Sequence, residues 1–201
     1  MKKELFRFLK EYTTDVDTIN KLIVSSYISS KKIHLVKNIH INSLLIQRTD
    51  NEHEELKLFN EKFEIDTLEK VIEAFEYVIS PEDKVVSGAV YTPTKIREFI
   101  VDEIFSDIEN IENKTVCDPA CGCSGFLFTS IQKFRRLTKK SYKYIIENNI
   151  FGLDIKDYAI ERSKILLTLL AIENDEDYEE INFNLFVGNA HLLTHKSEIR
   201  L

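Results

Sequence analysis

The stretch Asp118–Phe126 reads DPACGCSGF and decides the fold of the second half of the chain. It follows a short β-prone segment, 114–118, and precedes a helical segment that runs to about Leu137. A turn of small residues between a strand and a helix presents backbone N–H groups at the strand's carboxyl end, where open α/β sheets bind ligands. Gly122 and Gly125 allow a ligand to approach the backbone closely. The pattern differs from GxGxxG, so a dinucleotide pyrophosphate site is poorly supported.

Two further strands are predicted after this turn. The segment 149–155 ends in Gly-Leu-Asp-Ile, a helix is predicted over 157–172, and apolar residues alternate in a third strand, at Ile181, Phe183, Leu185 and Val187. Strand, helix, strand, helix, strand is typical of a parallel sheet. The predicted fold class is therefore α/β.

Two side chains at the ends of these strands suit a nucleoside. Asp154 closes the second strand, where an acidic side chain can accept both hydroxyls of a ribose, and Ile155 beside it can lie flat against an adenine. Asn189 follows the third strand, and its amide can read the exocyclic amine of an adenine. The same residues also suit a helix cap and an ordinary Gly-Asn turn, so both interpretations stay open here.

Upstream of the turn, GAVYTP at 88–93 places hydroxyl groups beside the start of a helix, a combination that suits a carboxylate. Thr92 is predicted to cap that helix, with Pro93 at its first position. Its apolar residues are expected on one face: Ile96, Phe99, Ile100, Ile104 and Phe105.

The first eighty residues are predicted to be helical. Asp66 followed by Glu69 predicts a capping box at the start of the clearest helix, 66–79. Ser80-Pro81-Glu82-Asp83 predicts a boundary, because proline disfavours helix in the residue before it. We therefore expect a helical N-terminal module over 1–80 and a second domain over 85–201.

Composition excludes several classes of protein. The chain has 27 basic and 34 acidic residues, a net charge of −7, which argues against a polyanion binder held by bulk charge. The longest apolar run, 165–172, is too short to span a bilayer, and no apolar segment follows the Met-Lys-Lys start. A cytoplasmic protein without membrane contact is expected.

Three cysteines crowd into seven positions, at Cys117, Cys121 and Cys123, which is not a disulfide framework. Together with His191 and His195 they form a zinc set on paper. Buried or turn cysteines in a reducing compartment are the favoured interpretation, and no metal is expected.

Four motifs, in this order, resemble the cofactor half of the N6-adenine DNA methyltransferases, of the type I modification-subunit and type IIG kind. They read YTPTKIREFI, DPACGCSGFL, FGLDIKDYAIERSK and FVGNAHLL, and the likeness covers about residues 86–193. It implies part of a Rossmann-like sheet that binds S-adenosylmethionine. One departure is Ser124, where the family usually has glycine; serine adopts a positive φ at a higher cost, which implies a tighter loop or a lower affinity.

The resemblance also implies a role for each matched residue. The methionine carboxylate is expected beside Tyr91 and Thr92, and its amino group near Asp118. The loop backbone is expected at Ala120, Cys121 and Gly122. The ribose is expected on Asp154, the adenine ring on Ile155 and the adenine N6 at Asn189.

The catalytic motif of that family, Asn/Asp/Ser-Pro-Pro-Tyr/Phe, is absent. The only prolines are at 81, 93 and 119, so the chain has no Pro-Pro pair and no catalytic residue is assigned. The expectation is the N-terminal part of a site-specific adenine-N6 DNA methyltransferase of a restriction–modification system, with the C-terminal half of its domain absent and no activity by itself. The partners implied are double-stranded DNA, a specificity subunit and a restriction subunit.

Two alternatives from other classes stay open. A nucleotide- or NAD-binding oxidoreductase is disfavoured by the absent GxGxxG and by the 36 residues from Asp118 to Asp154, against roughly 20 in a compact dinucleotide unit. The other is a non-catalytic interaction module derived from a methyltransferase.

Overall fold

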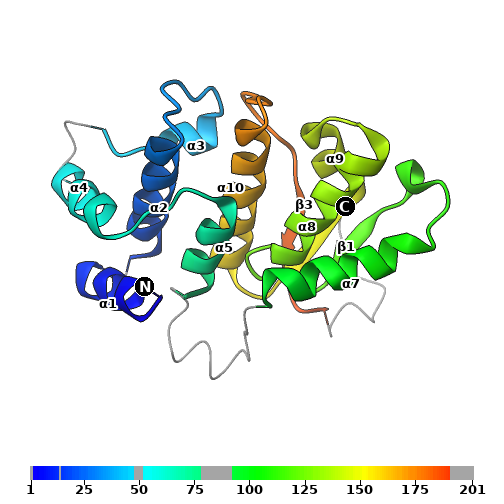
Figure 1. The fold of residues 1–201 in the computed structure, drawn as a ribbon, viewed down its shortest axis with the longest axis horizontal. Coiled ribbons are helices and arrows are strands. Elements are labelled where there is room, and N and C mark those ends of the chain that lie inside the picture. The colour runs from blue at the N-terminus through cyan, green and yellow to red at the C-terminus, as the bar shows by residue number, and fades with distance from the viewer. Residues whose placement is uncertain (1, 14, 48–51, 78–91, 191–201) are drawn as a thin grey trace. The chain divides into compact units, whose positions relative to one another are not determined.

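A computed structural model describes the 201-residue chain except residues 1, 14, 48–51, 78–91 and 191–201, which are grey in Figure 1. Contacts divide the chain into two compact units. One unit comprises Met1–Tyr91 with Asp177–Glu180, and the other Thr92–Glu176 with Ile181–Leu201. Tyr91, a predicted site residue, lies outside the described residues. The predicted boundaries at 80 and 85 fall there too, and the domain assignment stays a prediction.

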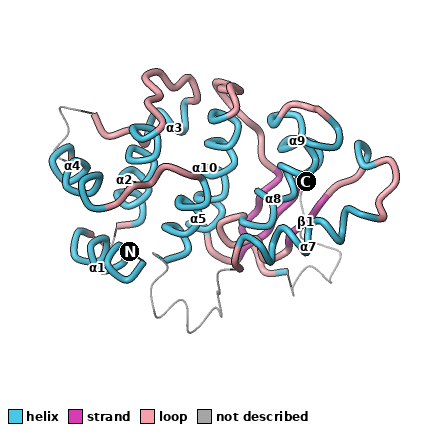
Figure 2. The backbone as a smooth tube through the Cα atoms, in the orientation of Figure 1, coloured by secondary structure: helices cyan, strands magenta, loops and turns pink. Residues whose placement is uncertain are grey.

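The described part of the first unit is helical, as the sequence indicated. Its core consists of large apolar side chains that are fully buried, among them Leu22, Phe59 and Phe75. Figure 2 shows its helices in cyan. They are α1 (Lys2–Tyr12), α2 (Val16–Ser30), α3 (Ile39–Ser43), α4 (His53–Lys62) and α5 (Leu68–Tyr77).

The predicted capping box at Asp66 and Glu69 is wrong. The α5 helix begins at Leu68, and the Thr67 hydroxyl accepts a hydrogen bond from the Lys70 N–H at 3.2 Å, the geometry of an N-cap at Thr67. Asp66 instead forms an ion pair with Lys70, 2.7 Å between Oδ1 and Nζ. Asp66 and Thr67 are both residue types that suit the N-cap position. The Asp66 carboxylate is paired with the Lys70 side chain, and Thr67 caps the helix.

The second unit contains a parallel three-stranded sheet in the order β1-β2-β3, coloured magenta in Figure 2. The strands are β1 (Val116–Asp118), β2 (Ile150–Asp154) and β3 (Asn184–Val187). Its helices are α7 (Thr94–Ser106), α8 (Gly125–Thr138), α9 (Tyr142–Asn149) and α10 (Asp157–Glu173), with a 3-10 turn at Ile111–Asn113. The predicted alternation of strands and helices is confirmed, and α9 is an additional helix that the sequence analysis did not predict.

Helices α8 and α10 pack on the sheet and contribute many of the buried side chains of this unit. Helix α8 packs on β1 and β2, and α10 packs on β2 and β3. Ile165 to Ile172, the longest apolar run of the chain, is buried along its whole length. No helix within the described ranges is long and apolar enough to cross a membrane.

Helix α7 departs from its prediction at its start. It begins at Thr94, and Pro93 is an extended N-cap with ψ 142°. The Pro93 carbonyl accepts the first helical hydrogen bonds, from Ile96 and Arg97. Thr92 is therefore not the cap, and proline is not at the first helical position.

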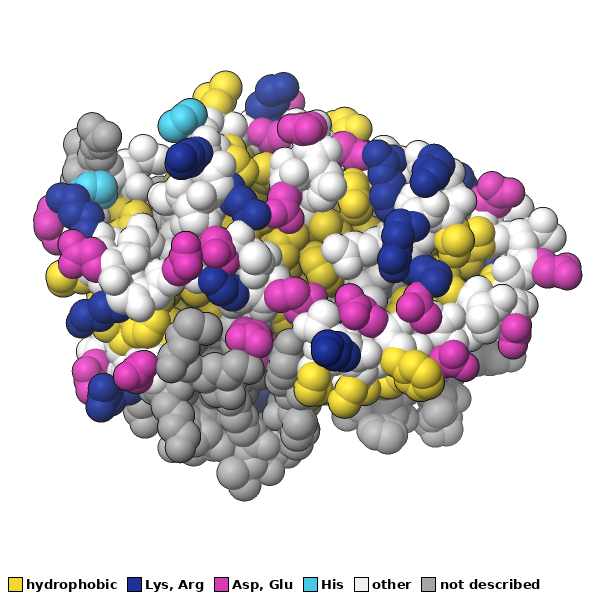
Figure 3. All heavy atoms as spheres, viewed as in Figure 1, with side chains coloured by type: hydrophobic (Ala, Val, Ile, Leu, Met, Phe, Trp, Pro, Cys, Tyr) yellow, Lys and Arg dark blue, Asp and Glu magenta, His cyan; other side chains and the backbone are white. Residues whose placement is uncertain are grey.

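The apolar face of α7 is also not the predicted one. Phe105 is buried, and its ring meets Phe134 of α8 edge to face with centroids 5.1 Å apart. The other four predicted members, Ile96, Phe99, Ile100 and Ile104, are exposed, between 37% and 64%. Hydrophobic side chains gather over α7 in Figure 3. The face that packs on α8 consists of Arg97, Val101 and Phe105.

Candidate functional site

The carboxyl ends of the three strands lie at one edge of the sheet. Because the strands are parallel and in register, with Asp118 opposite Gly152 and Asp154 opposite Val187, the turns after them converge. A single cofactor that contacts both the 118–126 loop and Asp154, as the resemblance implies, requires the 118–126 turn and the 152–155 turn at the same edge. The structure confirms that requirement.

The turn after β1 folds against the end of β2 through backbone hydrogen bonds. The Cys121 N–H donates to the Leu153 carbonyl at 2.9 Å, and the Ser124 N–H donates to the Cys121 carbonyl at 2.7 Å. Gly122 and Ser124 adopt left-handed conformations, with φ 53° and φ 65°. A positive φ at Ser124 agrees with the expectation that this position favours glycine, since a left-handed conformation costs an L-residue about 1–2 kcal/mol.

Asp154 holds this edge together. Its Oδ2 accepts from the Gly122 N–H and its Oδ1 from the Lys156 N–H, both at 2.9 Å. Its carbonyl accepts from the Gly188 N–H at 2.8 Å. Asp154 therefore accepts hydrogen bonds from the turns after all three strands. Each of its carboxylate oxygens keeps a further lone pair for a ligand hydroxyl.

Asp118 adds a second carboxylate to the edge. It is half-buried, and its Oδ1 accepts from the Ala120 N–H at 3.1 Å. Burial raises the pKa of this carboxyl above its ordinary value, and the Asp154 carboxylate also raises it, against the opposing hydrogen bond from Ala120. Two acidic groups at one edge favour a ligand with a positively charged centre.

Cys121 is a packing residue of the loop. It is buried beneath both carboxylates, and burial, with the Asp118 and Asp154 charges, raises the pKa of its thiol to about 12. A pKa this high favours the protonated thiol at neutral pH and disfavours the reactive thiolate. That the backbone of Ala120, Cys121 and Gly122 lines a ligand site stays a prediction.

The outer predicted residues are accessible. Ile155 is 55% exposed at the end of β2, and Asn189 is exposed after β3. Thr92 is half-buried. These residues lie in the same unit as the loop, and their roles stay predictions.

Two supporting residues were missed by the sequence analysis. The buried Ser163 hydroxyl of α10 donates to the Gly122 carbonyl at 2.9 Å and to the Ala159 carbonyl at 2.8 Å, and the two carbonyls share its proton. Buried Arg97 of α7 contacts both Thr92 and α8. A serine or an arginine inside an amphipathic helix carries no sequence signal of burial.

A comparison with protein-family models decides the classification. The model described as N-6 DNA Methylase matches residues 64–190, more than half of the chain. The chain belongs to the N-6 DNA methylase family. This confirms the resemblance to the N6-adenine DNA methyltransferases that the four motifs indicated.

Curated relatives of this N-6 DNA methylase include proteins of restriction–modification systems. A type I restriction enzyme methylase subunit of Methanocaldococcus jannaschii is 24% identical over 148 residues, covering 69% of this chain and 25% of the relative. A type II methyltransferase of a Vibrio species is 29% identical over 115 residues, covering 57% and 25%. A putative type II restriction enzyme and methyltransferase of M. jannaschii is 30% identical over 80 residues, covering 33% and 7%. The chain thus spans a quarter or less of these relatives.

The zinc set considered for this methylase chain is not assembled in the described ranges. There, no three His, Cys, Asp or Glu side chains lie close enough to hold a metal ion. His191 and His195 lie outside the described residues. Cys117 is exposed while Cys121 and Cys123 are buried, and none of these three cysteines is in a disulfide bond.

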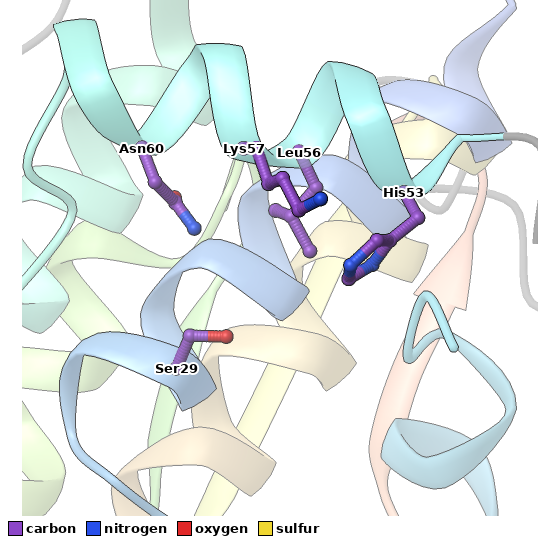
Figure 4. A pocket seen from close by; sticks show the side chains of 5 residues that line it. All are labelled: Ser29, His53, Leu56, Lys57 and Asn60. Carbon is purple, nitrogen blue, oxygen red and sulfur yellow. The ribbon is translucent and has the colours of Figure 1, made fainter. Parts of the chain in front are cut away.

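A separate cavity of about 400 Å³ lies in the helical unit of the methylase chain. Figure 4 shows its lining, in which His53, Leu56, Lys57 and Asn60 of α4 lie opposite Ser29 of α2. Lys57 forms an ion pair with Glu54, 2.7 Å between Nζ and Oε1. None of the predicted cofactor residues lines this cavity.

Proposed function

We propose that this N-6 DNA methylase chain binds S-adenosylmethionine at the carboxyl edge of its parallel sheet, as part of a Rossmann-like methyltransferase sheet. The observation that carries the proposal is the Asp154 carboxylate, which is hydrogen-bonded to the Gly122 loop and lies beside the exposed Ile155. Asp154 would hold the ribose and Ile155 would pack on the adenine.

The charge at this edge suits the same cofactor. S-adenosylmethionine carries a sulfonium and an ammonium group, and the Asp118 and Asp154 carboxylates supply negative potential for both. Asp118 would lie near the amino group, and Tyr91 with Thr92 near the carboxylate. The loop backbone at Ala120, Cys121 and Gly122 would line the cofactor, and Asn189 would meet the adenine N6.

The parent activity in this proposal is methylation of adenine N6 in double-stranded DNA within a restriction–modification system. The bound cofactor would supply the methyl group for the amine of a flipped adenine: the N–C bond would form as the C–S bond breaks, with S-adenosylhomocysteine and the amine proton released, and the rate would come mainly from orientation. The expected partners are a specificity subunit and a restriction subunit. Since these 201 residues contain no Pro-Pro pair, they would bind the cofactor without transferring its methyl group.

Calorimetric titration of the chain with S-adenosylmethionine and, separately, with NAD tests the cofactor. Saturable binding of the first alone is expected. Asp154→Asn should weaken it about tenfold or more, because a ligand hydrogen bond to a charged group is worth about 1.5–3 kcal/mol. Asp157→Asn is the matched control, since Asp157 is an exposed carboxylate three residues away at the start of α10.

Binding of NAD but not S-adenosylmethionine would contradict the proposal and favour the oxidoreductase alternative. Absence of binding to either, with a defined oligomer, would favour the interaction module. Incubation with radiolabelled cofactor and unmethylated DNA tests whether the chain transfers the methyl group by itself. Label in the DNA above the background without protein would show that the chain is active by itself.

A further inference from the structure

Arg97 is a charged side chain inside the second unit. It is 1% exposed, on the face of α7 that packs against α8. Its Nη1 donates to the main-chain carbonyl of Thr92 at 3.2 Å, and its Nε lies 3.4 Å from the Thr129 hydroxyl. A buried guanidinium is costly unless its donors have partners, so this placement is specific.

The contacts of Arg97 join two sequence motifs. Thr92 belongs to the YTP motif, whereas Gly125 and Thr129 form the first turn of α8, directly after the DPACGCS loop. The Thr129 hydroxyl donates to the Gly125 carbonyl at 3.1 Å. A Cβ atom at Gly125 would lie only 3.2 Å from Arg97 Nη1, so the guanidinium packs directly on the helix start.

We infer that Arg97 is a positioning residue for the amino-acid end of the cofactor. It fastens the Thr92 main chain to the first turn of α8 and brings a positive charge to that turn. This inference rests on the proposed binding of S-adenosylmethionine. It assigns recognition of the carboxylate to the side of the site near α7 and α8, and leaves the nucleoside to the end of β2.

The electrostatics support this division. The two acidic groups at the carboxyl edge, Asp118 and Asp154, repel a carboxylate, so the cofactor's carboxylate needs a positive region of its own. The N-terminus of α8 supplies partial positive charge from its backbone N–H groups, and the Arg97 guanidinium adds a full charge behind them. Because Arg97 is buried, it acts through Thr92 and this turn.

Arg97→Met tests the inference, because methionine keeps much of the apolar volume and removes the charge and the donors. Its dissociation constants are measured for S-adenosylmethionine and for 5′-methylthioadenosine, which has the nucleoside but no amino-acid group. We expect the first to rise about tenfold and the second to change less than about twofold. A merely structural role would weaken both equally, and that result would overturn the inference.

Thr129→Val provides a milder variant in case Arg97→Met does not fold. It removes the hydroxyl that faces Arg97 Nε. It should weaken binding of S-adenosylmethionine about threefold, again without affecting binding of 5′-methylthioadenosine. Thr168→Val is the matched control, since Thr168 is equally buried and its hydroxyl donates to the Lys164 carbonyl one helical turn back. An equal effect of Thr168→Val would also overturn the inference.

The wild-type titration separates the two proposals. Wild type that binds neither ligand contradicts the proposed function, and the role of Arg97 with it. Wild type that binds S-adenosylmethionine, with Arg97→Met binding it equally well, contradicts only the role of Arg97.

Discussion

Replacing Gly152 by alanine places a methyl group at the centre of the sheet, where β2 meets both β3 and α8. An ideal Cβ at this position would lie 2.7 Å from Leu185 Cδ2, 3.0 Å from Leu127 Cδ1 and 3.1 Å from Cys121 Sγ. All three neighbours are buried, between 0% and 7% exposed, so none can turn toward solvent. Carbon atoms in contact prefer about 3.5–4.0 Å, and relief therefore requires several atoms to move together.

The expected cost follows from overpacking. An extra methyl group in a close-packed core destabilises by about 1–3 kcal/mol. With a urea dependence of about 2 kcal/mol per molar, a loss of about 2 kcal/mol lowers the unfolding midpoint by about 1 M. Because Cys121 belongs to the candidate cofactor loop, the same displacement should weaken S-adenosylmethionine binding.

The assay is urea unfolding followed by far-ultraviolet circular dichroism, with Gly188→Ala as the matched control. A Cβ at Gly188 would lie 3.2 Å from Leu153 Cδ1, and among the described residues it would meet no other side chain closer than 4.0 Å. A much smaller midpoint shift is expected for the control. Equal midpoints for Gly152→Ala and Gly188→Ala would refute the packing argument.

Three further changes test the loop and its electrostatics. Gly122→Ala should cost about 1 kcal/mol, because alanine pays for φ 53°, and lower cofactor affinity; unchanged urea stability would show that the loop relaxes freely. Ser163→Ala should cost about 1 kcal/mol in the same titration, since the Gly122 carbonyl loses a donor. Asp118→Asn should stabilise the fold at neutral pH and weaken cofactor binding. Its wild-type pKa is raised on folding, so wild-type stability falls as pH rises from 3.8 through the folded pKa. The stabilisation by Asp118→Asn should therefore vanish in unfolding titrations below pH 3.8. A stabilisation that persists there has another cause.

The sheet and its functional edge were predictable because their signals are local. Alternating apolar residues and small-residue turns specify where each strand ends, and parallel pairing then brings those ends to one edge. Asp154 therefore lies where the sequence placed it, beside the loop after β1. What the sequence did not indicate is that its two oxygens would accept hydrogen bonds from the Gly122 and Lys156 backbone.

The missed features depend on contacts between distant residues. Helix α9 is only eight residues long, its N-cap Ser141 accepts from the Tyr144 N–H, and its apolar stripe consists of just Tyr142, Ile145 and Ile146. Composition predicts arginine at the surface, yet Arg97 is buried because the Thr92 carbonyl and the Thr129 hydroxyl meet it there. Such partners become visible only in three dimensions.

The start of α7 was also mispredicted, and a single hydrogen bond from the Arg97 side chain is involved. Thr-Pro before a helix fits a threonine N-cap so well that the pattern alone favours it. A residue at the N-cap gives its carbonyl to the first helical N–H, but the Thr92 carbonyl accepts from Arg97 Nη1 and the Pro93 carbonyl takes over the helical bonds. The helix thus begins one residue later than the pattern predicts, and the Thr92 carbonyl is bound by the buried arginine instead.

Helix α7 also shows why periodicity cannot choose between two apolar faces. Its sequence carries one stripe through Ile96, Ile100 and Ile104, and a second through Val101 and Phe105. The second packs on α8, where Phe105 meets Phe134 and Arg97 meets Thr129. If the longer stripe faced the core, fewer polar groups would be buried. In the structure the shorter stripe faces α8 together with Arg97, whose partners on α8 and at Thr92 lie in three dimensions and not in the helix periodicity.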